Sequence, residues 1–153
     1  LLSQDVGCKL GMWEYREQFI RPFARLLAQY EQSNVPVAVI LEPDSLPNLI
    51  TNSGNPRCGP ATRRAYLEGV AFAVSHIATV APKTHLYIDA GHGGWLGWEQ
   101  HARSFGELVC EMGITRFVRG LCAAPARASN HRDRGARATQ PSSDLGRAAI
   151  DRP

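Results

Sequence analysis

The sequence lacks the features that mark several large classes of protein. It has no apolar run near the roughly 18 residues of a membrane span, so we expect no membrane partner. Its glycines do not follow the GxGxxG or Walker A spacing that cradles phosphate, which leaves a βα-type nucleotide binder as a weak alternative. The four cysteines form no CxxC pair. We therefore expect neither a bound metal nor another cofactor.

The chain also lacks the excess of basic residues, outside its last 33 positions, that a nucleic-acid-binding face needs. The net charge is only +3, and residues 121–153 account for it with six arginines against three aspartates. The first 120 residues carry 11 basic and 11 acidic side chains. Because a basic tail is not a basic binding face, we expect no nucleic-acid partner.

Hydrophobic periodicity predicts alternating helices and strands. Apolar residues at steps of three and four predict helices over residues 14–32, 60–81 and 98–112. Continuous apolar runs predict strands over residues 37–42, 84–90 and 114–120. The many prolines and glycines between residues 43 and 59 predict a loop. This order of elements indicates an α/β fold with a parallel sheet.

The segment from residue 121 to 153 differs from the rest of the chain. It has no Phe, Trp or Tyr, eight alanines and scattered arginines, so it has little apolar surface to offset chain entropy. We expect it to be disordered. Two explanations stay open: a natural flexible tail, or non-native sequence such as a shifted reading frame or a retained intron.

Acidic residues follow two of the predicted strands. Asp44 comes after Glu42 and a proline, and Asp89 precedes a glycine-rich stretch. Ligands of parallel α/β proteins bind at the carboxyl ends of the strands, so we expect Asp44 and Asp89 to face one crevice. An aspartate at a strand end is also often only a turn or helix cap, and that alternative stays open.

Two tryptophans lie three residues apart in the glycine-rich stretch after Asp89. Trp95 and Trp98 are suited to stacking on a flat sugar ring, or they anchor the core. His92 with Asp89 and His85 supplies no ligand set with the spacing of a metal site.

The remaining candidates are cysteines. Cys110 lies on an apolar helical stripe and is expected to be a buried thiol. Cys8 and Cys58 lie in loop-like sequence, and each is a candidate for a disulfide with the other or with a further cysteine.

Three segments resemble glycoside hydrolase family 6, the cellobiohydrolases and endoglucanases that cut β-1,4-glucan with inversion. VAVILEPDSLPNLITN at 37–52 is similar to the family's active-site signature, and THLYIDAGHGGWLGW at 84–98 to its second hallmark. NPRCGPATRRAYLEGVAFAV at 55–74 is similar to the loop, disulfide cysteine and helix between them. The resemblance implies a partial, distorted parallel β/α barrel of about three βα units. It assigns residues 1–120 to a partial catalytic domain.

The resemblance also implies roles for single residues. Asp44 matches the general acid, and the implied substrate-binding positions are Asp89, His92, Trp95 and Trp98. The implied substrate is β-1,4-glucan, as cellulose or cello-oligosaccharides. Secretion is implied by the insoluble substrate, although no signal peptide is visible. The alternative is a truncated, inactive glucan-binding remnant that uses Trp95 and Trp98.

The sequence departs from the family at both ends. The upstream loop that supplies the partner of the Cys58 position has no counterpart, and neither does the later part that holds the carboxylate usually proposed as base. A three-stranded piece leaves sheet edges unpaired and an apolar face uncovered. We therefore expect it to be unstable alone or to need a partner segment.

Overall fold

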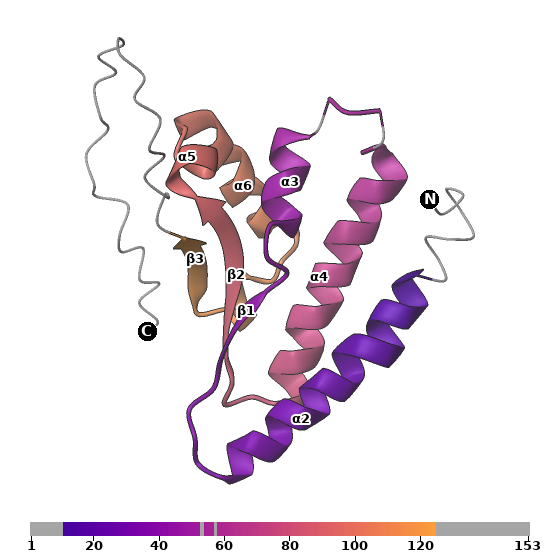
Figure 1. The fold of residues 1–153 in the computed structure, drawn as a ribbon, viewed down its shortest axis with the longest axis vertical. Helices are drawn as coiled ribbons and strands as arrows, with labels where there is room; N and C mark the ends of the chain where they lie inside the picture. Colours follow the sequence, from indigo (N-terminus) through magenta and orange to yellow (C-terminus); the bar gives the residue numbers. More distant parts are fainter. Residues whose placement is uncertain (1–10, 53, 57, 125–153) are drawn as a thin grey trace, which may run out of the picture.

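A three-stranded parallel sheet forms the centre of the molecule (Figure 1). The computed structural model describes residues 11–52, 54–56 and 58–124. The strand order is β1 (Ala38–Leu41), β2 (His85–His92) and β3 (Gly120–Ala124), and both neighbouring pairs run parallel. The α/β fold with a parallel sheet is thus confirmed.

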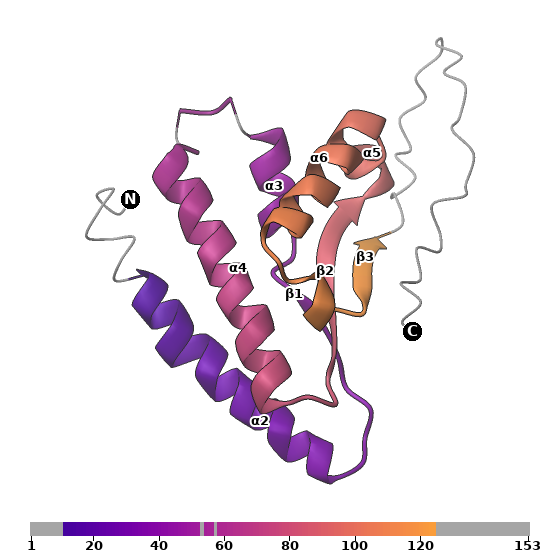
Figure 2. The same ribbon diagram turned by 180° about the vertical axis from the view of Figure 1, so that it is seen from behind.

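One face of this sheet is covered by helices, and no helix of the described residues covers the other (Figure 1 and Figure 2). Leu41 and Ile88 pair in register and are both buried. Helix α6 (Glu99–Glu111) lies behind the strands in Figure 1 and in front of them in Figure 2. No described helix lies in front of the strands in Figure 1, and Ile40 is 48% exposed. The predicted uncovered apolar face is therefore present in the described part of the chain.

The core lies between the sheet and its helices. Helix α4 (Pro60–Val80) leads to β2 and packs against α2 (Arg21–Gln32). Fully buried side chains from several elements meet there, namely Ile20, Leu46, Val74, Ile77, Leu86 and Ile88. Within the described residues, no helix combines the length and the apolar character needed to cross a bilayer.

The first helix is irregular near its start. Residues Tyr15–Ile20 form a π-helical segment, η1, and α2 continues from Arg21. The N–H of Arg21 donates to the carbonyl of Arg16, five residues earlier. Pro22 has no N–H to donate to the preceding turn and its ring crowds that turn. A wider turn just before the proline accommodates both effects.

The loop predicted over residues 43–59 is wrong in part, because it contains helix α3 (Ser45–Thr51). Pro47 lies in the first turn of α3, where a backbone N–H has no intrahelical acceptor to lose. Leu46 and Leu49 are buried and give the helix its apolar face. The prediction failed because it counted Pro47 as a breaker regardless of position.

The last strand is displaced from its predicted range. Residues Thr115–Phe117 form a 3-10 turn, η2, instead of the strand expected over 114–120. Ile114 and Val118 are buried, so the apolar pattern reflects a turn packed on the core. Strand β3 begins at Gly120, so residues 121–124 belong to the sheet and the expectation of disorder is wrong for them. Residues 125–153 lie outside the described residues.

Candidate active site

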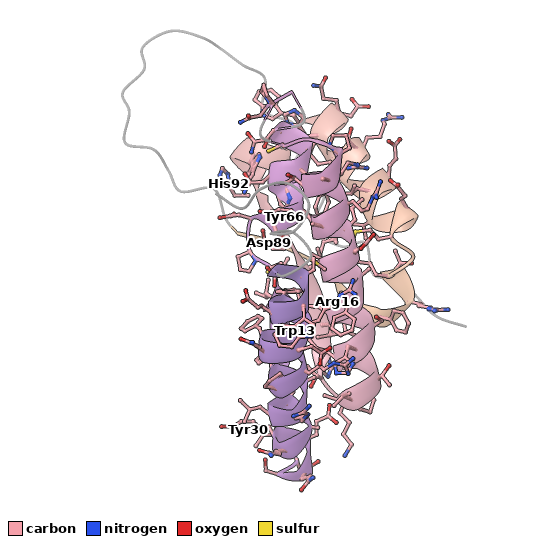
Figure 3. All side chains as sticks on the ribbon, turned by 90° about the vertical axis from the view of Figure 1, so that its right-hand side faces the viewer. Trp13, Arg16, Tyr30, Tyr66, Asp89 and His92 are labelled. Carbon is pink, nitrogen blue, oxygen red and sulfur yellow. The ribbon has the colours of Figure 1, made fainter. Side chains whose placement is uncertain are left out.

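Strands β1 and β2 bring Asp44 and Asp89 together at the carboxyl end of the sheet. Oδ2 of Asp89 accepts a hydrogen bond from the backbone N–H of Asp44 at 2.8 Å and another from the N–H of Gly91 at 3.1 Å. Asp89, His92 and Tyr66 lie in the upper half of the molecule in Figure 3, above Trp13 and Tyr30. The expected proximity of the two acidic positions is confirmed by the first of these bonds.

The two carboxylates differ in what they already do for the fold. The N–H of Gly91 donates to the carboxylate of Asp89 two residues earlier, at an irregularity within β2, so Asp89 has a local structural role of the kind that the capping alternative describes. Asp44 is the N-cap residue of α3, yet its side chain makes no capping hydrogen bond and is exposed. The Asp44 carboxylate is therefore accessible and is not used to hold the helix.

The backbone around Asp44 is strained. Glu42 and Asp44 have φ of 50° and 65°, in the left-handed region that non-glycine residues rarely occupy. The backbone N–H and Oγ of Ser45 both donate to the carbonyl of Glu42, at 3.1 and 2.8 Å. Such strain persists only where the surroundings hold it, and it clusters at functional sites.

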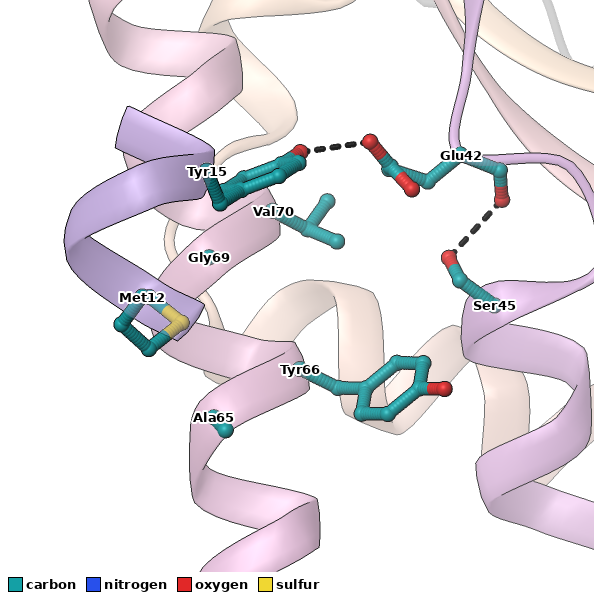
Figure 4. Close-up of a pocket in the computed structure, with 8 residues that line it drawn as sticks. All are labelled: Met12, Tyr15, Glu42, Ser45, Ala65, Tyr66, Gly69 and Val70. Carbon is teal, nitrogen blue, oxygen red and sulfur yellow. Dashed lines mark hydrogen bonds between the residues drawn. The ribbon is translucent and has the colours of Figure 1, made fainter. Parts of the chain in front are cut away.

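A half-buried tyrosine contacts the other end of Glu42. The hydroxyl of Tyr15 donates to Oε1 of Glu42 at 2.6 Å. Burial, followed by the hydrogen bond and the negative charge of Glu42, raises the pKa of Tyr15 well above its ordinary value. Both residues line a pocket of about 240 Å³, together with Ser45, Tyr66 and Val70 (Figure 4). Local sequence patterns do not predict this pair, because its two members are 27 positions apart in the chain.

The glycine-rich stretch after β2 holds Trp95 in a defined place. Residues Gly93–Leu96 form a short helix, α5. The indole N–H of Trp95 donates to Oγ1 of Thr51 on α3 at 3.1 Å. Gly91 has a φ of 64°, and a Cβ there would lie 2.9 Å from Cε3 of Trp95. The ring of the exposed His92 lies 5.9 Å from that of Trp95. Trp95 therefore anchors the loop.

Trp98 differs from Trp95 in exposure. It precedes α6, and 64% of its surface is exposed. An open indole ring of this kind is available for stacking on a flat ligand. The two tryptophans of the sequence pattern thus have different environments.

The cysteines correct one expectation and leave another untested. Cys110 is exposed, whereas the sequence predicted a buried thiol. The buried side of α6 is formed by Phe105, Leu108 and Val109, and Cys110 falls outside it. Cys58 is half-buried and free. Cys8 lies outside the described residues, so a disulfide at Cys58 stays a prediction.

The residues of this site lie within a segment that matches a known protein family. The model of the glycosyl hydrolases family 6 matches residues 6–145. The chain belongs to glycosyl hydrolases family 6. The match includes both acidic strand ends and runs past the boundary predicted after residue 120.

Individual family 6 relatives agree with this assignment. The chain is 39% identical over 102 residues to exoglucanase A of Cellulomonas fimi, which covers 67% of this chain and 12% of that protein. The catalytic domain of Cellulomonas fimi Cel6B superposes with a TM-score of 0.68 at 33% identity, covering 80% of this chain and 28% of that one. Cellobiohydrolase II of Humicola insolens, in complex with glucose and cellotetraose, has a TM-score of 0.60 at 32% identity, covering 78% and 31%.

The family 6 chain is short beside these proteins. It spans 12% of exoglucanase A and 23% of the 1,4-beta-D-glucan cellobiohydrolase CEL6B of Podospora anserina, to which it is 42% identical over 103 residues. The matched part of the chain therefore corresponds to about a quarter or less of each of these two relatives.

Proposed function

We propose that this chain supplies the general acid of a β-1,4-glucan hydrolase, and that Asp44 is this acid. One observation carries the proposal: the Asp44 carboxylate is exposed at the tip of β1 and makes no capping bond to α3, while the Asp44 backbone is tied to Asp89. A side chain free of structural duty on a strained, well-held turn suits a residue that must meet a substrate. Membership in glycosyl hydrolases family 6 supports the reaction class.

The proposed reaction inverts the anomeric carbon. The bond between that carbon and the glycosidic oxygen breaks, the leaving oxygen takes the proton of Asp44, and a water molecule adds from the opposite ring face while it gives a proton to a carboxylate base of the intact catalytic domain. In inverting enzymes the two carboxyl groups are roughly 6.5–9.5 Å apart to admit this water. Oδ2 of Asp89 already accepts hydrogen bonds from two backbone N–H groups. We therefore assign Asp89 a role in holding the turn that carries Asp44 and in lining the substrate cleft.

The proposed substrate is cellulose or a cello-oligosaccharide. The exposed ring of Trp98 suits stacking on a glucose unit, and the exposed His92, whose ring lies 5.9 Å from that of Trp95, offers a further polar group. Trp95, fixed by Thr51, shapes the loop that holds both. Action on an insoluble polymer also implies that the intact protein is secreted.

We further propose that the three βα units are part of a distorted parallel barrel. The open face of the sheet, on which Ile40 is exposed, would be its inner side. Residues 1–120 are the proposed partial catalytic domain, and β3 extends it to Ala124. A fragment of a barrel leaves edge strands unpaired, so the described part of the chain is expected to gain stability from a further segment.

The second candidate is a glucan-binding remnant without turnover. The exposure of Trp98 favours it. Binding needs only the stacking surface, whereas hydrolysis also needs a base and a closed cleft.

Product release from cellohexaose tests the first candidate. The purified chain is compared with Asp44→Asn, and the anomer of fresh product is read by NMR. We expect the α-anomer from the natural chain and a loss of rate of about 10²–10⁴-fold in the variant. Full activity in Asp44→Asn would refute the assignment.

Calorimetric titration with cellohexaose separates the second candidate. Affinity that persists in Asp44→Asn and falls in Trp95→Ala and Trp98→Ala, with no product from any variant, would identify a binding remnant. Product formation by the natural chain would exclude it.

A further inference from the structure

We propose that Tyr15 is a positioning residue that holds the turn carrying Asp44, an inference that rests on the proposed role of Asp44 as the acid. The hydroxyl of Tyr15, in η1, donates to Oε1 of Glu42 at 2.6 Å. Glu42 follows directly after β1 and lies two residues before Asp44. The contact therefore joins the first helix of the chain to the residue that begins the turn.

The turn is held at several points by different elements. Ser45 of α3 holds the main-chain carbonyl of Glu42 through two hydrogen bonds. Asp89 of β2 holds the N–H of Asp44. These contacts hold the backbone, whereas Tyr15 holds the Glu42 side chain. Among the described residues, Tyr15 is the one hydrogen-bond partner of the Glu42 carboxylate.

The left-handed backbone makes these contacts necessary. Glu42 and Asp44 both have positive φ, which costs a non-glycine residue free energy unless the surroundings hold it. If Glu42 relaxes to a common conformation, the chain direction at Asp44 changes and the acid is displaced from its substrate. A displacement of about 1 Å can lower a catalytic rate by about 10²-fold.

The chemistry of the pair suits a permanent contact. Burial and the adjacent Glu42 raise the pKa of Tyr15, so the phenol keeps the proton that it donates. A hydrogen bond from a neutral hydroxyl to a carboxylate is shorter and stronger than one between neutral groups. The 2.6 Å distance agrees with such a bond.

Tyr66 offers a matched control in the same pocket. Figure 4 shows Tyr15 and Tyr66 on the walls of the 240 Å³ pocket. Of these two tyrosines, only Tyr15 has a dashed line at its hydroxyl. The Tyr66 hydroxyl makes no hydrogen bond with another described residue. Tyr66→Phe and Tyr15→Phe therefore remove the same atom from the same pocket, and only the second breaks a contact to Glu42.

Amide hydrogen exchange on the full chain is the deciding measurement. We expect the amides of Asp44 and Ser45 to exchange about tenfold or more faster in Tyr15→Phe, as for loss of a hydrogen bond to a charged group. The same amides should be unchanged in Tyr66→Phe. The amides of Val74 and Ile88 in the core should keep their rates in both variants, which separates a loosened turn from global destabilisation. Equal rates at Asp44 and Ser45 in the two variants would overturn the proposal.

The kinetic arm uses hydrolysis of cellohexaose. Displacement of the acid should lower kcat about tenfold or more in Tyr15→Phe and leave KM within about twofold, because the substrate still binds. Tyr66→Phe should keep both constants. A kcat for Tyr15→Phe equal to that of Tyr66→Phe would overturn the proposal.

A double-mutant cycle tests the route through Glu42. Tyr15→Phe should add nothing to the turn's exchange rates when Glu42 is already alanine, whereas Glu42→Gln keeps an acceptor oxygen and should preserve most of the protection. Additive effects would show that Tyr15 acts by another route and would overturn the proposal. If the natural chain releases no product, the proposed function fails by itself, and the exchange rates still decide whether Tyr15 holds the turn.

Discussion

The carboxylate of Asp89 accepts a hydrogen bond from the backbone N–H of Asp44 at 2.8 Å, across 45 positions of sequence. The same oxygen accepts the N–H of Gly91. One side chain on β2 thereby sets the backbone of the turn after β1 and that of the irregular end of its own strand. The proposed acid and the glycine-rich loop are held relative to each other through this single carboxylate.

The first prediction concerns that carboxylate. Asp89→Ala should lower the free energy of unfolding by about 1–3 kcal/mol, because two backbone N–H groups lose their charged acceptor. Asp89→Asn keeps an acceptor oxygen without the charge and should lose about half as much. Urea denaturation measures both. Equal losses in the two variants would contradict this account.

A second prediction concerns Gly91. Gly91→Ala should destabilise the chain by about 1–3 kcal/mol, because its φ is 64° and the added Cβ would lie 2.9 Å from the Trp95 ring. Gly106 in α6 is the control, since a Cβ there meets nothing within 4 Å. Gly106→Ala should raise stability by up to about 1 kcal/mol through helix propensity. Thermal unfolding of the two variants checks the opposite signs.

Substitution of the two tryptophans should have different effects: loss of Trp95 should lower the stability, and loss of Trp98 should weaken glucan binding. Trp98→Ala should leave the melting temperature nearly unchanged, because the ring is mostly exposed. Trp95→Ala should lower the stability by about 3–5 kcal/mol at most, since its half-buried ring packs on Gly91 and its indole is bonded to Thr51. Calorimetric titration with cellohexaose should show weaker binding in Trp98→Ala. Unchanged affinity in that variant would remove Trp98 from the proposed subsite.

Tyr15 should make the chain sensitive to alkaline pH. Burial first, and then Glu42, raises the pKa of Tyr15 in the folded state. Above pH about 10 the unfolded tyrosine ionises while the folded one keeps its proton, so stability falls with rising pH by up to about 1.4 kcal/mol per pH unit. Below that pH the contribution is fully present.

Denaturant unfolding from about pH 8 to about pH 11, which brackets the ordinary pKa of tyrosine, checks that stability falls as pH rises. Tyr15→Phe should flatten the alkaline loss, and Tyr66→Phe serves as the comparison. Parallel pH profiles for the natural chain and Tyr15→Phe would show that Tyr15 titrates alike in both states.

Parts of the fold that depend on local pattern were predictable. The ranges of α4 and α6 agree with the predicted helices to within one residue at each end. Helix α3 was missed because Pro47 is a breaker only inside a helix, and its place in the first turn depends on where the helix begins. Strand β3 was displaced because the apolar residues before it pack as a turn.

Some features of the candidate site were likewise predictable from the sequence and others were not. Its acidic positions were found because parallel strands end at one edge of a sheet, which places Asp44 near Asp89 without further information. The bond from Tyr15 to Glu42 was not found, since it depends on how η1 packs against the end of β1. The different environments of Trp95 and Trp98 depend on α3, which was itself missed.

The sequence by itself determined the order of helices and strands, the parallel sheet and the two acidic strand ends, because periodicity and chain breaks are local properties of a polypeptide. The tertiary structure decided which carboxylate stays free. Asp89 is engaged by the backbone N–H groups of Asp44 and Gly91, and Asp44 is left exposed on strained backbone. That difference arises from contacts between segments far apart in the chain, whose geometry is set only when the core packs.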